Sequence, residues 1–223
     1  IRLSLVGSEM CIRDSHKGVQ GLGPTRRLEI HNLAHAVQRL NADIVCLQEV
    51  RAFNHQMQRR FAHWPSQGQA QVLAPRGFES LYRTNAVTRH GEHGNALLSR
   101  WPVLQHSHHD VSDHRFEQRG LLHAVLSLEG TAVHVVVVHL GLVHASRLRQ
   151  VQRLGRFVEQ TVPADAPLIV AGDFNDWESR LHLPMAQFGL HTFEQQRLAT
   201  FPSRLPLLGL DRIYTRGLRP VQA

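Results

Sequence analysis

The stretch LIVAGDFND, residues 168–176, decides how the chain is interpreted. Its four leading aliphatic residues predict a short buried strand, which ends at Gly172 and Asp173. The alternation of Asp173 and Asn175 places two polar side chains on one side of a short extended segment. A carboxylate there can take a proton from water while the amide orients that water, which is typical of a hydrolytic site. An Asx turn leaving the strand is the alternative interpretation.

Two other apolar runs also end in a polar group. IVCLQ, residues 44–48, leads into Glu49, and VVVV, residues 135–138, leads into His139. Groups at strand ends can converge on one sheet edge, so three such endings favour a site over three ordinary turns. Glu49 suits Mg²⁺, which takes one or two carboxylates and keeps waters and phosphate oxygens. A glutamate at a helix N-terminus beside the strand is the alternative.

A third acid lies in LDRIY, residues 210–214. Asp211 stands at a predicted strand start between apolar neighbours, so we expect it to be partly buried and to need a partner. Arg212 points to the opposite face of a strand and is a poor candidate for that partner. A histidine elsewhere in the chain suits this role, because a carboxylate can orient an imidazole.

The remaining pattern mixes helices with hairpins. Apolar spacing predicts helices over residues 25–40, 53–63 and 148–158, the last with Arg147, Arg149, Arg153 and Arg156 around its outer side. Strands are predicted at 44–47, 82–88, 95–99, 121–128, 131–140, 168–171 and 210–214, with a loop over 65–77 and a hairpin turn at Glu129-Gly130. Hairpins combined with strand–helix units predict an α/β fold with mixed sheets.

Composition narrows the class of protein further. The 223 residues are 42% hydrophobic, which favours one domain with a real core, and the run 135–138 is too short to span a bilayer. The two cysteines, Cys11 and Cys46, form no disulfide framework or zinc pattern, so we expect a cytoplasmic protein. The net charge of +7 favours polyanionic partners such as nucleic acid or anionic lipid, and a basic surface that serves only solubility is the alternative.

Both ends of the chain differ from the rest. Residues 1–15 are similar to translated adapter sequence, and residues 219–223 stop just after a predicted strand. We therefore expect a non-native leader over 1–15 and a single, C-terminally incomplete domain over 16–223.

These pieces together resemble the endonuclease/exonuclease/phosphatase family, the DNase I-like metal-dependent phosphoesterases. The matching stretches, in order, are NADIVCLQE (41–49), HGNALLSRWP (93–102), VHL (138–140), AGDFND (171–176) and LDRIY (210–214). They span about residues 16–218. The stretches 114–120 and 200–206 are most similar to uncharacterised bacterial members.

The resemblance implies a four-layer αββα sandwich of two mixed sheets flanked by helices. By the same resemblance, Glu49 binds Mg²⁺, with Mn²⁺ as a second option, while Asp173 and Asn175 activate and position water. His139 hydrogen-bonds the scissile phosphate, and Asp211 orients a second histidine. The resemblance also implies that Asn95 lines the cleft as a substrate-binding group.

Two departures from the family pattern stand at the ends. Members carry an asparagine at the end of the first strand, where this chain has Asp14 and Ser15. Members also close with a Ser-Asp-His motif some distance after the last strand, and we expect that this sequence stops before this motif, whose histidine is the one that Asp211 would orient. The implied activity is Mg²⁺-assisted attack of water on a phosphodiester, as in a nuclease, by a monomer. The alternatives are a phosphatase or phosphodiesterase acting on lipid headgroups or small phosphoesters, and a non-catalytic polyanion-binding remnant of the fold.

Overall fold

The computed structural model describes residues 18–20, 26–192 and 210–218. The leader expected over residues 1–15 and the stretch 200–206 lie outside these residues. The elements are β1 (Val19–Gln20), β2 (Arg27–Leu28), α2 (Ile30–Leu40), β3 (Ile44–Val50), α3 (His55–Arg60), α4 (Gln69–Leu73), β4 (Glu79–Thr88), β5 (Gly91–Ser99), β6 (Val103–Asp110), β7 (Gly120–Leu128), β8 (Thr131–His139), α5 (His144–Thr161), β9 (Leu168–Asp173), α6 (His182–Ala186) and β10 (Asp211–Arg216).

Two sheets carry most of these strands. The larger sheet has the order β10-β9-β8-β7-β6, and it is mixed because β8 and β9 run parallel while every other pair is antiparallel. A parallel pair needs a long crossover, and α5 supplies it. The smaller sheet, β3-β5-β4, is antiparallel throughout its described strands. Strands β1 and β2 form a separate ribbon.

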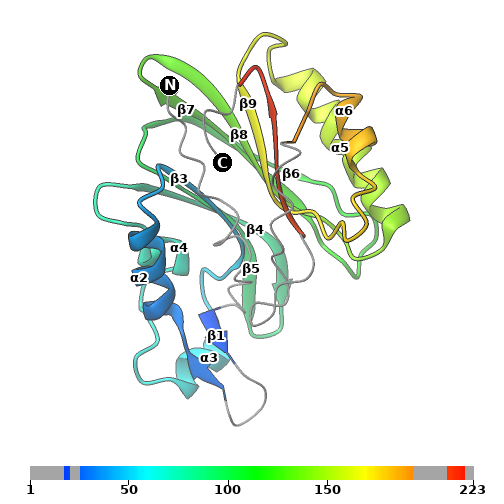
Figure 1. Ribbon diagram of the computed structural model, residues 1–223. Coiled ribbons are helices and arrows are strands. Elements are labelled where there is room, and N and C mark those ends of the chain that lie inside the picture. Colours follow the sequence, from blue (N-terminus) through cyan, green and yellow to red (C-terminus); the bar gives the residue numbers. More distant parts are fainter. Residues whose placement is uncertain (1–17, 21–25, 193–209, 219–223) are drawn as a thin grey trace.

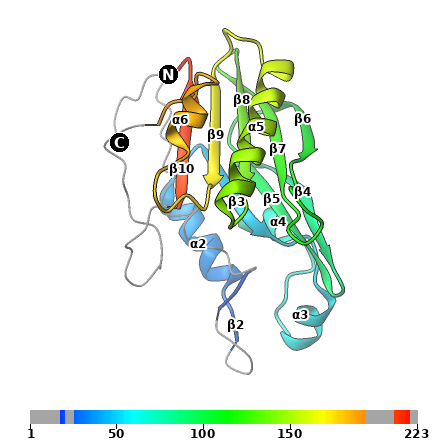
Figure 2. The same cartoon turned by 90° about the vertical axis from the view of Figure 1, so that its right-hand side faces the viewer.

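Three apolar cores separate four layers, which confirms the expected αββα sandwich (Figures 1 and 2). Helices α2 and α4 cover the smaller sheet, with Ile30 and Val37 packed near Leu98. The two sheets face each other across a core that includes Cys46 and Leu122. Helices α5 and α6 cover the outer face of the larger sheet. Among the described helices, none is long and apolar enough to cross a membrane.

The run of four valines in β8 follows directly from this layering. Successive side chains of a strand point to opposite faces. Val135 and Val137 enter the core between the sheets, whereas Val136 and Val138 enter the core beneath α5. Because neither face of such a strand is exposed to solvent, its sequence is continuously apolar.

Several elements depart from the sequence predictions. Strand β2 occupies two residues of the predicted helix 25–40, which begins only at Ile30, and β1 and α6 were not predicted. Three further differences concern β6, α4 and α5. Strand β6 was not predicted, because at the edge of the larger sheet its outer positions are exposed and polar and its apolar alternation is weak. Helix α4 lies within the predicted loop 65–77. Helix α5 begins at His144, four residues earlier than predicted, and Arg147 in its first turn is buried rather than on the outer side.

A chain of histidines lies on the larger sheet beneath α5. His123 Nε2 and His134 Nδ1 are 3.0 Å apart, and both residues are buried. The Ser107 hydroxyl links His123 Nδ1 to His109 Nε2, at 3.3 Å from each. The ring of Phe157 covers His109 and His123. Burial lowers the pKa of His123 to about 4, and the charges of His134 and His109 act in the same direction.

Acidification is therefore predicted to destabilise the fold. The ordinary pKa of histidine is 6.5, so the unfolded chain binds a proton that folded His123 rejects. The free energy of unfolding then falls as the pH drops from 6.5 towards about 4. Thermal unfolding followed by circular dichroism measures this slope. His123→Gln should flatten it, whereas His35→Gln, at an exposed position on α2, should leave it unchanged; equal slopes in all three proteins would contradict the assignment.

Candidate active site

Three strands of the larger sheet bring His139, Asp173 and Asp211 into one row. In the parallel pair β8–β9, His139 lies opposite Asp173 at the carboxyl ends of both strands. In the antiparallel pair β9–β10, the first residue of β10, Asp211, lies opposite Asp173. The His139 Nε2 and Asp173 Oδ2 atoms are 3.8 Å apart. Two carboxylates and an imidazole therefore share one edge of the sheet.

The turn after β9 fixes Asn175 beside this row. Its backbone N–H donates to Asp173 Oδ1 at 2.7 Å, which is the Asx turn, and its Nδ2 donates to the Leu140 carbonyl at 2.9 Å. Asn175 has φ 48°, a left-handed conformation that asparagine tolerates better than most residues. The segment is thus a turn and not the extended piece that the alternation predicted. The Asx turn and the functional interpretation hold together, because the turn places the amide next to the carboxylate.

The smaller sheet contributes Glu49 through a bulge in β3. Leu47 pairs with Ala96 and Val50 with Gly94, so Gln48 and Glu49 together stand opposite one residue. Glu49 has φ 56°, a conformation that costs about 1 kcal/mol or more for a residue other than glycine. Bulges of this kind redirect a side chain and are frequent beside active sites.

Glu49 is close to the row because β3 packs against β9. Gly172 has φ 146°, and a Cβ built on it would stand 2.0 Å from the Val138 carbonyl oxygen and 3.1 Å from Gln48 Nε2. The Gln48 amide therefore fills the space over Gly172. Gln48 is followed on β3 by the predicted metal ligand Glu49, and Gly172 is followed on β9 by the predicted base Asp173. Glycine is required here because a Cβ would clash with the Val138 carbonyl of β8 and because a φ of 146° is strained for any other residue.

Asn95 lies inside the sandwich. It is fully buried on β5, and its Nδ2 donates to the carbonyls of Gly120 and Val137, at 2.8 and 3.1 Å, on the larger sheet. These two hydrogen bonds tie the sheets together two residues before His139. In the structure Asn95 thus links the two sheets, and the contact of Asn95 with substrate stays a prediction.

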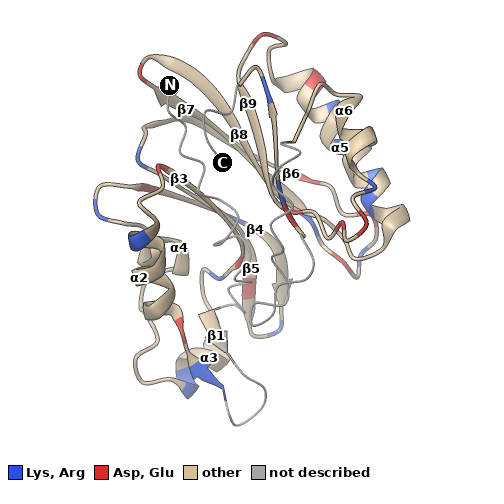
Figure 3. Ribbon diagram, in the orientation of Figure 1, with Lys and Arg blue, Asp and Glu red and all other residues tan. Residues whose placement is uncertain are grey.

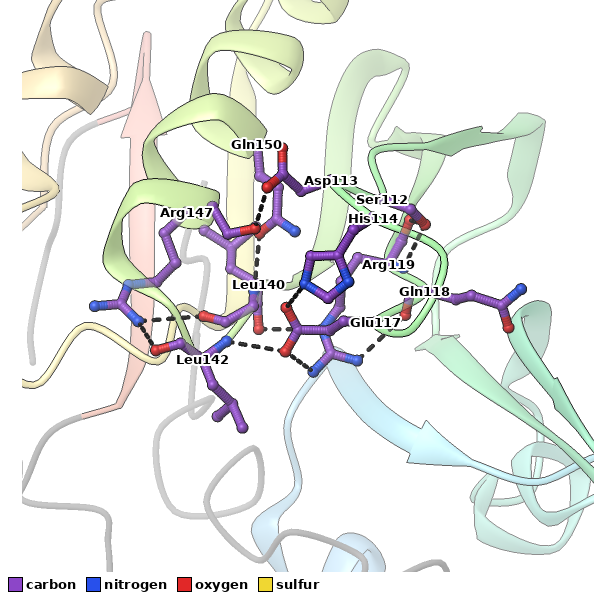
Figure 4. Close-up of polar contacts among 12 residues, drawn as sticks. Ser112, Asp113, His114, Glu117, Gln118, Arg119, Leu140, Leu142, Arg147 and Gln150 are labelled. Carbon is purple, nitrogen blue, oxygen red and sulfur yellow. Dashed lines mark hydrogen bonds and ion pairs between the residues drawn. The ribbon is translucent and has the colours of Figure 1, made fainter.

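A polar network holds the loop that follows His139 (Figure 4). The Leu140 carbonyl accepts from Arg119 Nε at 3.2 Å as well as from Asn175. Glu117 Oε1 accepts from the Leu142 N–H at 3.0 Å and from Arg119 Nη2 at 3.3 Å. The loop before β7 is therefore bonded to the loop after β8.

Arg147 holds the same loop from the other side. Its Nη1 donates to the carbonyls of Gly141 and Leu142, at 3.2 and 2.6 Å, and the Gly141 N–H donates to Gln150 Oε1 at 2.8 Å. Burial lowers the pKa of the Arg147 guanidinium, and the carboxylate of Asp176 acts in the opposite direction. Arg147 is thus a positioning residue for the segment between His139 and α5.

Asp176 and Arg212 stabilise the next turn. Asp176 is fully buried, and its carboxylate accepts from the N–H groups of Arg180 and Leu181, at 3.1 and 2.9 Å. Arg212 Nη2 donates to the Asp176 carbonyl and to Ser179 Oγ, at 3.2 and 2.7 Å. Arg212 therefore serves the turn, consistent with the expectation that it does not partner Asp211.

The donor set fits a hard divalent cation. Within residues 18–20, 26–192 and 210–218, no three His, Cys, Asp or Glu side chains are grouped so that they could hold a metal. Mg²⁺ needs no such cage, because it binds through one or two carboxylates and keeps several waters. Glu49 is a partly exposed carboxylate on β3, which packs against β9, and it matches that requirement.

Sequence reasoning missed Arg147, Glu117 and Gln150. The heptad-like spacing of α5 places arginines on its outer side, but it does not reveal that the first turn faces a neighbouring loop. One signal for their role near the site is that Arg147 and Gln150 follow His139 by only eight and eleven residues in the sequence. Glu117 carries no local pattern, since its partners lie in another loop.

Comparison with known proteins identifies the family of this chain and a bacterial relative. The family model described as Endonuclease/Exonuclease/phosphatase family matches residues 19–223. The chain is 40% identical over 210 residues to the uncharacterized protein YbhP of Escherichia coli strain K12, covering 91% of this chain and 82% of the relative.

Two solved structures share the fold. An endonuclease/exonuclease/phosphatase family protein from Leptotrichia buccalis aligns with a TM-score of 0.64 at 16% identity, over 83% of this chain and 80% of that one. The mannosyl-6-phosphatase Bt3783 of Bacteroides thetaiotaomicron aligns with a TM-score of 0.62 at 16% identity, over 84% and 76%.

Replacing Arg147 should weaken the fold around the site. Arg147→Met keeps the buried aliphatic stem but leaves the Gly141 and Leu142 carbonyls without their donor. Since hydrogen bonds from a charged group contribute about 1.5–3 kcal/mol each, the free energy of unfolding should fall by about 3 kcal/mol. Urea unfolding measures this change.

Arg156→Met is the matched control on the same helix. Arg156 is exposed and its side chain bonds only the Gln152 carbonyl, at 3.4 Å. Its replacement should change the free energy of unfolding by no more than about 0.5 kcal/mol. Equal losses in the two variants would contradict the positioning role of Arg147.

Proposed function

Because the chain belongs to the endonuclease/exonuclease/phosphatase family, we propose that it hydrolyses phosphodiester bonds with a divalent cation held at Glu49. Members of this family are phosphoric ester hydrolases, and the named Bacteroides neighbour is a phosphatase. The observation that carries the proposal is the row of His139, Asp173 and Asp211 beside the strand that bears Glu49.

Asp173 is the proposed general base. It stands at the end of β9 with one carboxylate oxygen bound by the Asn175 N–H, which leaves the other towards His139. Asn175 uses its Nδ2 on the Leu140 carbonyl, so its amide oxygen is the atom that can accept a hydrogen bond from water. Water held by this pair is positioned to attack phosphorus in line with the leaving oxygen.

His139 is the proposed donor to the phosphate. Its ring is mostly buried, and the strand that carries it is fixed beyond its end by the Leu140 N–H, which donates to the Asp173 carbonyl at 2.8 Å. A fixed donor at a place where charge develops stabilises the transition state more than a mobile one does. We propose that Asp211 orients the imidazole of a second histidine, distinct from His139.

Glu49 would hold the cation, and Mg²⁺ is the proposed ion with Mn²⁺ as a substitute. When bound, such a cation neutralises the charge that builds on a non-bridging phosphate oxygen. We propose that the strained bulge serves this purpose, because such strain is often retained where a backbone conformation directs a functional side chain.

Asp173→Asn should lose nearly all turnover while remaining folded. The amide keeps the shape of the carboxylate but cannot accept the proton of water, so the rate should fall on the order of 100-fold or more. Hydrolysis of bis(p-nitrophenyl) phosphate and relaxation of supercoiled plasmid, both with Mg²⁺, measure the rate. Asp165→Asn, on the exposed turn before β9, is the control. Activity retained in Asp173→Asn would rule out its role as base.

Metal binding can be tested without turnover. Mg²⁺ at a hundred times its Kd should raise the free energy of unfolding of the wild type by about 2.7 kcal/mol, because it binds only the folded state. Glu49→Gln should abolish that gain, whereas Glu159→Gln, exposed on α5, should keep it. Wild-type hydrolysis that survives EDTA, or an undiminished Mg²⁺ effect in Glu49→Gln, would overturn the assigned metal ligand.

A further inference from the structure

Four large apolar side chains near the candidate active site are exposed to solvent. Phe116, Leu142, Val143 and Trp177 are 83%, 59%, 58% and 52% exposed, respectively. Single exposed apolar residues are ordinary on protein surfaces, whereas a contiguous group marks a surface that meets something else. We refer to these four residues as the apolar rim.

Sheet topology places the four residues at one end of the larger sheet. Phe116 lies in the loop between β6 and β7, Leu142 and Val143 follow β8, and Trp177 follows β9. Strands β7, β8 and β9 are neighbours; β8 and β9 end where the antiparallel β7 begins. All three loops therefore leave the same edge of the sheet, the edge at which His139 and Asp173 lie.

The rim is held rigidly by the polar network already described. The Leu142 N–H donates to Glu117 and its carbonyl accepts from Arg147, so both main-chain groups are engaged. Figure 4 shows the Leu142 side chain pointing away from that network. A buried polar network that presents an aliphatic side chain to solvent indicates that the exposed position is specified by the fold.

The charges around the rim suit an anionic surface. The Arg115 guanidinium is exposed and lies 4.7 Å from the centre of the Phe116 ring. In the described parts of these loops, the exposed acid Glu178 is paired with Arg180, and Asp113 with Arg149. The whole chain carries a net charge of +7, and basic residues occur on the helices α2 and α5 that flank the sheets (Figure 3).

We propose that the apolar rim docks the active site on an anionic phospholipid bilayer, so that the substrate is a phosphoester carried by a membrane lipid. The substrate class rests on the proposed function, whereas the docking does not. Rim side chains would enter the boundary between headgroups and acyl chains while Arg115 contacts lipid phosphate. Duplex DNA matches the charge but offers no apolar layer to the aliphatic Leu142 and Val143, and for this reason we favour the bilayer.

Co-sedimentation of the full 223-residue chain with vesicles tests the docking. The vesicles contain phosphatidylglycerol and phosphatidylcholine in equal parts, with pure phosphatidylcholine for comparison, and EDTA prevents turnover. Leu142→Ser should weaken partition roughly 10-fold, because the lost burial is most of a leucine side chain. Leu104→Ser is the matched control: Leu104 is 61% exposed at the start of β6, at the sheet edge opposite the rim, and its replacement should leave partition unchanged.

Trp177 supplies a second measurement. Its fluorescence should shift to the blue on anionic vesicles and be quenched by brominated phosphatidylglycerol. Trp177→Phe keeps an aromatic rim, so it should still bind while the shift disappears. Circular dichroism of each variant shows that the fold is retained.

Several results would overturn the docking. These are a wild type that fails to bind anionic vesicles, equal partition of Leu142→Ser and the wild type, equal losses in both leucine variants, or a rim-dependent preference for duplex DNA. Hydrolysis of the soluble diester is measured separately, so vesicle binding without any hydrolysis overturns the proposed function and supports the docking. Hydrolysis without vesicle binding does the reverse.

Discussion

The parallel pairing of β8 with β9 is the interaction on which the rest of the structure depends. Parallel strands require a crossover, and α5 fills that role while covering the face of the sheet that Val136 and Val138 present. The pairing runs to the last residue of both strands, where His139 meets Asp173. The close approach of Gly172 to the Val138 carbonyl preserves this register at the point where chemistry begins.

The candidate site is built outward from that pairing largely by side chains that donate to main-chain carbonyls. The Leu140 carbonyl accepts from Asn175 and Arg119, and the two carbonyls after it accept from Arg147. Each loop at this edge is thereby bonded to its neighbour. The same bonds that steady His139 and Asn175 also fix the direction of Leu142, so the proposed chemistry and the proposed docking share one scaffold (Figure 4).

Local patterns in the sequence predicted the elements that are buried on both faces and little of what joins them. Continuous apolar runs marked β8 and β9, and Glu129-Gly130 marked the β7–β8 turn, because burial and turn chemistry leave local traces. Strand β6 escaped notice because an edge strand with exposed polar positions needs few apolar residues. The bulge at Glu49 and the burial of Arg147 depend on partners far away in sequence, and no local spacing records such partners. The placement of His139, Asp173 and Asp211 in one row depends on the strand order, which no local pattern records; the family resemblance implied only that these residues share a site.

The division of the site between two sheets has a consequence for the folding of this protein. Glu49 belongs to the smaller sheet and Asp173 to the larger, and the inner core and the Asn95 amide hold the two together. A partly folded chain that retains only one sheet would therefore lack either Glu49 or the row of His139, Asp173 and Asp211. The proposed activity thus requires that the two sheets be docked, and a chain in which they are separated should be inactive.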